Sequence, residues 1–218
     1  MTGSAAEYVP ETRSLRALAA ASKTCRGCEL YEDATQTVFG AGPRRARMLL
    51  VGEQPGDVED QAGEPFVGPA GKLLDSALRD AGIDRAEVYL TNAVKHFRWK
   101  PADRGKRRIH DKPAARHINA CRPWLAAELE LIRPETVVAL GAVACAALFG
   151  PSFTLTQHRG EILAWPPDSG PFGADSDSAR RAFATIHPSA VLRAGPARRE
   201  TYDGFVADLR LAAKHTPR

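Results

Sequence analysis

The chain has 218 residues, of which 44% are hydrophobic and 26% are charged, and its formal net charge is +4 with a pI near 9.0. This length suits one well-buried domain, and no apolar run reaches membrane-spanning length. No basic stretch followed by an apolar core opens the chain, so we expect no signal peptide and a single cytoplasmic domain, residues 1–218. The small positive charge does not by itself indicate a nucleic-acid partner, because its location matters more than its sum.

The N-terminal part combines a short predicted helix at residues 14–23 with a pair of closely spaced cysteines. Cys25 and Cys28 are separated by two residues, and the chain has four cysteines in all. Because thiols stay reduced in the cytoplasm, this spacing favours a metal site over a disulfide framework.

The first predicted strand is the apolar run at residues 47–52, which ends in the turn GEQPGD at residues 52–57. This turn lacks both the GxGxxG spacing of a dinucleotide site and the GK[ST] ending of a P-loop. Considered alone, it is equally well explained as a tight turn with a capping carboxylate.

A second apolar strand at residues 87–94 follows a predicted helix at 71–81, whose apolar residues recur at helical spacing. The loop before this helix, residues 64–71, presents one aromatic side chain, Phe66, which alone would more often belong to a core. The second strand ends in TNAVK, where Asn92 offers both an amide donor and a carbonyl acceptor.

A strongly basic segment follows the second strand and contains seven cations against one acid, Asp103. Such a run is often only a solvated loop, but beside a ligand site it also suits phosphate contacts. The seven cations are Lys95, Arg98, Lys100, Arg104, Lys106, Arg107 and Arg108.

The remaining elements alternate between helix and strand. Asp111 is the predicted N-cap of a helix that has Pro113 in its first turn and Cys121 on its apolar face. Residues 136–140 form a third strand, followed by a helix at 142–149 and a loop at 166–179. A fourth strand at 181–186 precedes HPSAVLR (187–193) and a closing helix at 200–214.

This order predicts a three-layer α/β/α domain with a central, mostly parallel four-stranded sheet. In such sheets, ligands bind outside the carboxyl ends of the strands. Three of the four strand ends carry polar side chains, so we expect a site where residues 52–57, 92–96 and 187–189 meet.

Five motifs in a fixed order resemble the signature of the family-4 uracil-DNA glycosylases: GEQPG, EPFVGPAGKLLD, TNAVK, CRPWL and HPSAVLR. The resemblance extends from about Cys25 to the last helix. It implies the uracil-DNA glycosylase-like fold and a hydrolase that removes uracil from DNA in base-excision repair.

The resemblance also implies a uracil pocket, in which Phe66 stacks on the base, Asn92 binds its polar edge and His187 lies near O2. A donor near O2 would stabilise the anion on which uracil leaves, and the amide of Asn92 would discriminate against cytosine. Gly52, Gln54 and Asp57 would form a wall of this pocket.

Because the base must first leave the stack, a side chain is needed to fill the gap. Leu192 and Arg193 are the candidates for this role. Because basic residues beside such a pocket suit phosphate contacts, we also expect four cations to contact DNA: Lys106, Arg107, Arg108 and Arg193.

Two departures from family 4 resemble the UdgX group, whose members stay covalently attached to DNA after uracil is removed. Gln54 replaces the usual alanine, and the segment KRRIH ends in His110. This resemblance implies that His110 is the nucleophile, because a neutral imidazole near C1′ competes with water for the sugar. Glu53 would orient His110, accept its proton or stabilise the cationic sugar, and the sequence leaves these three roles open.

The resemblance further implies that Cys25, Cys28 and Cys121 ligate a 4Fe-4S cluster, which needs four protein ligands. His96 occupies the position of a cysteine found in the family, so we expect His96 as the fourth ligand. His117 and Cys145 are the alternatives, and a structural Zn site with the same ligands is the runner-up.

The sequence therefore predicts a monomeric uracil-DNA glycosylase that acts on uracil-containing DNA, including single-stranded DNA. It cleaves the N-glycosidic bond and becomes linked to the abasic site through His110. The alternatives are a conventional turnover glycosylase, a non-catalytic module that binds damaged DNA, and an electron-transfer protein.

Overall fold

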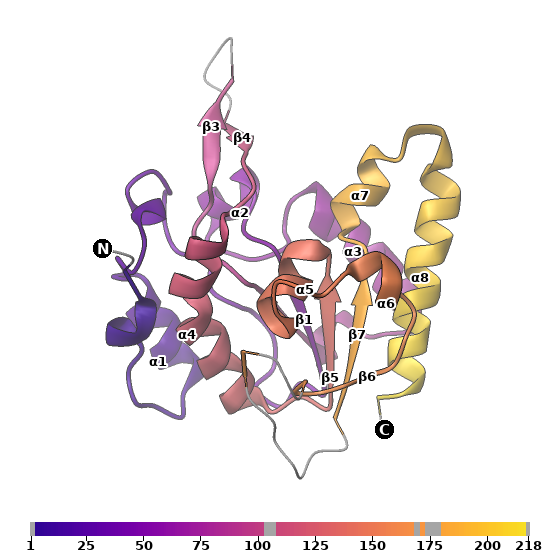
Figure 1. The fold of residues 1–218 in the computed structure, drawn as a ribbon, viewed down its shortest axis with the longest axis horizontal. Helices are drawn as coiled ribbons and strands as arrows, with labels where there is room; N and C mark the ends of the chain where they lie inside the picture. The colour runs from indigo at the N-terminus through magenta and orange to yellow at the C-terminus, as the bar shows by residue number, and fades with distance from the viewer. Residues whose placement is uncertain (1–2, 103–107, 168–170, 173–179, 217–218) are drawn as a thin grey trace.

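A five-stranded sheet forms the centre of the computed structural model, which describes residues 3–102, 108–167, 171–172 and 180–216 (Figure 1). The strand order is β2-β1-β5-β7-β6. The first four strands are parallel, and β6 pairs antiparallel with β7 at one edge. Their bounds are β1 Met48–Gly52, β2 Val88–Asn92, β5 Thr136–Leu140, β6 Leu163–Ala164 and β7 Arg181–Thr185.

The four predicted parallel strands are present, and the mostly parallel α/β architecture is confirmed. Each is an apolar run that is buried along nearly its whole length, as expected for a sheet covered on both faces. The additional strand β6 has only two residues and no apolar periodicity, so its sequence gives no strand signal.

Two helical layers cover the sheet, because alternate strand residues point to opposite faces. Leu49 and Val51 pack against the layer that contains α4 (Ala115–Ile132) and α5 (Ala142–Phe149). Met48 and Leu50 pack against α3 (Pro69–Asp80) and α8 (Arg198–Lys214). Beyond α4 lies a third apolar cluster formed with α1 (Leu15–Ser22) and the N-terminal segment.

Several short elements surround the carboxyl ends of the strands. These are α2 (Asp57–Ala62), α7 (Pro188–Arg193) and an antiparallel hairpin of β3 (Trp99–Pro101) and β4 (Arg108–His110). The hairpin projects at the same end of the molecule as α7 (Figure 1). The other short elements are α6 (Leu155–His158) and the 3-10 turns Ala5–Tyr8, Glu29–Tyr31, Arg85–Glu87 and Gly195–Ala197.

The predicted start of the long central helix at Asp111 is wrong, because α4 begins at Ala115 with Ala114 as its N-cap. Asp111 instead belongs to the base of the hairpin, where its N–H donates to the carbonyl of Arg98 and its carboxylate pairs with the same arginine. The Ala114 N–H is capped by Nδ1 of His117, three residues later. No helix among the described residues is long and apolar enough to cross a membrane.

Candidate active site

The register of the two central strands brings Gly52 beside Asn92 at the carboxyl edge of the sheet. A Cβ atom on Gly52 would lie 2.4 Å from Oδ1 of Asn92 and 2.6 Å from Cζ of Phe66. Only glycine therefore lets the amide and the aromatic ring approach each other here. Asn92 is 3% exposed, and no hydrogen bond between described residues involves its side-chain amide.

Phe66 is held in a left-handed backbone conformation, with φ of 58°, by the loop that precedes α3. Such strain in a non-glycine residue costs about 1–3 kcal/mol and tends to occur at functional sites. Glu59 joins this loop to the first strand end, because its carboxylate accepts from the N–H groups of Gly68 (2.8 Å) and Gly56 (3.1 Å). The sequence analysis missed this role of Glu59, although its position three residues after a helix N-cap is a capping signal.

His187 lies opposite Phe66, with ring centroids 6.3 Å apart and an interplanar angle of 30°. Its Nδ1 accepts from the backbone N–H of Ser189 at 3.2 Å, so in the neutral ring the proton resides on Nε2. Burial, together with the charges of His110 and Arg193, lowers the pKa of His187 to about 4. At neutral pH this imidazole is therefore an uncharged donor through Nε2.

Glu53 and His110 face each other across the site, with Oε1 and Nε2 3.5 Å apart. Oε1 of Glu53 is buried and accepts no hydrogen bond from any residue that the structure describes. Burial raises the pKa of Glu53, whereas burial and the nearby Arg193 lower the pKa of His110. The pair thus consists of a carboxyl group whose Oε1 accepts no hydrogen bond and an imidazole whose lowered pKa keeps it uncharged at neutral pH.

Gln54 braces the base of the β3–β4 hairpin. Its Nε2 donates to the carbonyls of Arg98 (3.0 Å) and Asp111 (3.1 Å), and its Oε1 accepts from the Arg98 N–H (3.1 Å). These three bonds engage the whole amide with backbone, so a direct contact to a ligand, as predicted for Gln54, stays a prediction.

Arg108 attaches the hairpin to α2 through internal ion pairs. Its guanidinium pairs with Asp57 and with the fully buried Asp60 (2.6 Å), and it lies over the rings of Phe97 and Trp99. The side chain is only 17% exposed. The structure therefore gives Arg108 and Asp57 a bracing role, and phosphate contact by Arg108 stays a prediction. Lys106 and Arg107, predicted with it, lie outside the described residues, whereas Arg193 is exposed at the end of α7.

Lys95 does not belong to the basic DNA-facing surface, so its assignment to phosphate contacts is wrong. It is fully buried, and its ammonium donates to Glu128, to Thr91 and to the backbone carbonyl of Asn92 (2.8 Å). Glu128 also accepts from Tyr89. A strand-end lysine looks like a surface cation in the sequence because its partner lies 33 residues away.

The four predicted cluster ligands, Cys25, Cys28, His96 and Cys121, line one small cavity behind the hairpin. The Sγ atoms of Cys25 and Cys121 accept hydrogen bonds from Trp124 Nε1 (3.3 Å) and from the backbone N–H of Lys95 (3.2 Å). Among the described residues, no three His, Cys, Asp or Glu side chains converge closely enough to hold a metal ion.

The two alternative ligands lie elsewhere. His117 caps α4 through Nδ1 and contacts Glu29 through Nε2 (2.8 Å), and Cys145 belongs to α5, where it is buried in the core. Burial raises the pKa of Cys121 to about 12 and lowers that of His96 to about 4. Three thiols, of which those of Cys25 and Cys121 are buried, and a neutral imidazole around one cavity match the donor set of a soft metal centre.

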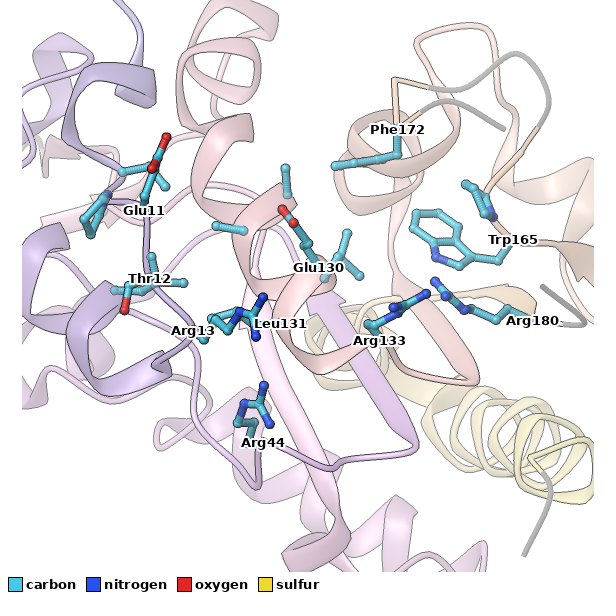
Figure 2. Close-up of a pocket in the computed structure, with 17 residues that line it drawn as sticks. Glu11, Thr12, Arg13, Arg44, Glu130, Leu131, Arg133, Trp165, Phe172 and Arg180 are labelled. Carbon is cyan, nitrogen blue, oxygen red and sulfur yellow. The ribbon is translucent and has the colours of Figure 1, made fainter. Parts of the chain in front are cut away.

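A larger groove, of about 1,330 Å³, lies away from this site, beside the C-terminal end of α4. Figure 2 shows Arg133 and Arg180 beside Trp165, with Arg13 and Arg44 on the other side of the helix end. None of the predicted site residues lines it. The size of a cavity therefore does not identify the site in this protein.

Comparison with known proteins gives a consistent result. Residues 39–210 match the model of the Uracil DNA glycosylase superfamily. The chain is 36% identical over 172 residues to a Type-4 uracil-DNA glycosylase of Thermotoga maritima, covering 78% of this chain and 79% of the relative. It is 32% identical over 201 residues to one of Archaeoglobus fulgidus (89% and 91% covered) and 33% identical over 174 residues to one of Sulfurisphaera tokodaii (78% and 71% covered).

Proposed function

The chain belongs to the uracil-DNA glycosylase superfamily, and we propose that it excises uracil from DNA and then becomes covalently linked to the abasic sugar through His110. The observation that carries the second part is the 3.5 Å approach of His110 Nε2 to the unpartnered Oε1 of Glu53. The excision itself is supported by the Type-4 relatives and by the strand-end pocket.

Two side chains at the strand ends, Phe66 and Asn92, recognise the base. Uracil stacks on Phe66 and presents its polar edge to the amide of Asn92, which is buried and has no partner among the described residues. Cytosine presents the reversed donor and acceptor pattern at this edge, and a mismatched buried pair is penalised strongly. Asn92 therefore selects for uracil.

His187 stabilises the leaving group. The bond between C1′ and N1 breaks, and its electron pair departs with uracil as an anion that is delocalised onto O2. The Nε2–H of His187 donates to this oxygen, since Nδ1 is engaged by Ser189. A neutral donor with a pKa near 4 strengthens its hydrogen bond as charge develops, without giving up its proton.

His110 then captures the sugar. Loss of uracil leaves an oxocarbenium-like C1′, and a lone pair of the neutral imidazole forms the new C–N bond to it. The imidazolium that results loses its ring proton to Glu53 or to water. Glu53 also stabilises the cationic sugar by its charge, and its buried, unpartnered oxygen is suited to both tasks.

Hydrolysis fails to compete because the hairpin keeps the imidazole close to C1′. Gln54 and Arg108 fix the hairpin at its base and against α2. A nucleophile positioned in this way has an effective concentration far above that of a mobile water. Since imidazole bound to a sugar carbon is a poor leaving group, the adduct persists.

We further propose that Cys25, Cys28, His96 and Cys121 hold a 4Fe-4S cluster of structural function. All four line one cavity, whereas His117 and Cys145 do not. When bound, the cluster cross-links the N-terminal segment to the residues on both sides of the hairpin. Iron and zinc analysis of the purified protein, with its visible absorption, tests this assignment; zinc without iron would contradict it.

The proposed function is tested by incubating the protein with labelled single-stranded DNA that contains one uracil, followed by a denaturing gel. We expect a DNA band retarded by the mass of the protein, and no such band for the same oligonucleotide with thymine. Free abasic DNA without the retarded band would contradict covalent capture and indicate a conventional glycosylase that turns over. Unmodified uracil DNA would contradict glycosylase activity altogether.

A further inference from the structure

A groove of about 760 Å³ lies between α3, α7 and the start of α8, and we refer to it as the flanking groove. It is separate from the base pocket and from the groove of Figure 2. Figure 1 shows these three helices grouped together, with α7 near the N-terminal start of α8. The residues that line the flanking groove are Pro69, Lys72, Leu73, Ser76, Leu192, Pro196, Arg198, Arg199 and Tyr202.

The flanking groove adjoins the proposed uracil site along the chain. Pro69, the first residue of α3, follows Phe66 by three residues, and Leu192 on α7 follows His187 by five. DNA whose uracil stacks on Phe66 and accepts from His187 at O2 therefore has a neighbouring nucleotide beside this groove.

The walls of the groove suit a nucleobase. They are mostly apolar, formed by two prolines, by Leu73 and Leu192, and by the ring of Tyr202. The hydroxyl of Tyr202 donates to Oδ2 of Asp80 at 2.7 Å, which fixes the orientation of the ring. An aromatic ring fixed in this way is a stacking surface for any base.

The rim of the groove suits a phosphate. Lys72 and Arg198 are exposed, and neither forms an ion pair with another described residue. Arg199 pairs with Asp203 (2.9 Å) and Arg79 with Asp80 (3.8 Å), so the charges of these two acids are offset by other cations. The charge that remains at the rim is therefore positive.

We propose that the flanking groove binds a nucleotide next to the uracil in single-stranded DNA. Its base stacks on Tyr202 and Leu192, and its phosphate binds Lys72 and Arg198. In a duplex, the neighbouring base is already paired and stacked, so entry into the groove would cost a second disruption. The groove therefore makes single-stranded DNA the preferred substrate. This inference rests on the proposed function for the position of the uracil.

Two measurements on the full-length protein test the groove. Fluorescence anisotropy gives the affinity for a uracil-free single-stranded oligonucleotide and for the matching duplex. Steady-state or single-turnover kinetics on the uracil-containing versions give the excision rate and its dependence on DNA concentration. The matched control is Arg13→Glu with Arg44→Glu, which makes the same charge change as the double groove variant but in the groove of Figure 2.

We expect Lys72→Glu with Arg198→Glu to weaken single-strand binding by about tenfold, and to reduce the slope of log affinity against log salt by about 1.4 for two lost phosphate contacts. Tyr202→Ala weakens it by about tenfold through lost stacking, and Tyr202→Phe, which keeps the ring, restores most of the loss. The maximal excision rate at saturating DNA is unchanged, because neither substitution touches the base pocket.

The outcomes separate the two proposals. Suppose that the groove variants bind single-stranded DNA more weakly, but no protein, the wild type included, releases uracil. This result would support the groove and contradict the proposed function. If the wild type excises uracil but the groove variants bind single-stranded DNA as tightly as the wild type, only the proposal for the groove is contradicted. An equal loss of affinity for duplex and single-stranded DNA, or an equal loss in the control Arg13→Glu with Arg44→Glu, would also contradict the proposal for the groove.

Discussion

The two walls of the pocket are built in different ways. The base-recognition wall consists of Gly52, Asn92, Phe66 and His187, and each is fixed by the central sheet or by a helix start. The capture wall is His110 on a two-stranded hairpin, which is separate from the central sheet. The hairpin is attached by the amide of Gln54 and the guanidinium of Arg108.

Under the proposed function, this difference predicts that base recognition and covalent capture can be separated by substitution. The first wall needs only the sheet and its loops, so excision can occur without the hairpin's histidine. The second wall needs the hairpin in one position relative to Glu53, which belongs to the end of β1. The predictions below act on one wall at a time.

The largest effect is expected for His110→Ala, which removes the nucleophile and leaves the base-recognition wall intact. The retarded band disappears completely, whereas uracil release continues with water as the acceptor. The assay combines the denaturing gel with measurement of free uracil from the same reaction. A surviving adduct would show that another residue captures the sugar.

Asn92→Ala should lower the release of uracil and the formation of the covalent adduct together. It removes the hydrogen bonds to the polar edge of the base, and we expect excision to fall by about 10²- to 10³-fold, with capture falling in proportion. Single-turnover release of uracil provides the measurement, and a thermal melt serves as the folding control. Loss of capture with normal excision would contradict the assignment of Asn92 to the base.

Arg108→Met should slow capture by about tenfold to a hundredfold with little change in excision, because it loosens the hairpin and misplaces the imidazole. The substitution also leaves Asp60 buried with one fewer partner. Adding Asp60→Asn removes the unpaired charge, so the double variant should regain stability but not the capture rate. If the double variant captures as fast as the wild type, Arg108 does not position the hairpin.

A smaller effect is expected from pH. His110 reacts as the neutral imidazole, and its pKa is below the ordinary value, so capture should stay constant from pH 8 downward until that lowered pKa is reached. Arg193→Ala removes a charge that lowers the pKa of His110 and of Glu53. Both values rise, so the acid limb of the capture rate at saturating DNA moves to higher pH. An acid limb at the same or a lower pH in Arg193→Ala would contradict this account.

The sequence predicted the strands that carry the proposed base-recognition wall but not the hairpin that carries His110, and the reason is physical. Strands β1, β2, β5 and β7 are buried apolar runs, and their order fixes which loops meet at the carboxyl edge. The hairpin strands have three residues each and contain Pro101 and several charges, so neither has a strand pattern.

Local sequence patterns also could not predict which distant residues the polar side chains contact. Gln54 contacts the backbone of residues 44 and 57 positions away, and Lys95 pairs with Glu128. Both side chains were assigned to ligand or DNA because the chain shows only their polarity. In the structure both side chains also brace the two walls, Gln54 through the hairpin and Lys95 through the backbone carbonyl of Asn92.

The central claim is a covalent bond between His110 and C1′ of the abasic sugar. Its most direct test is digestion of the adduct with protease and nuclease, followed by tandem mass spectrometry of the cross-linked peptide. The account predicts a deoxyribose-containing mass increment on His110. The same increment on another residue, or uracil release with no cross-linked peptide, would contradict it.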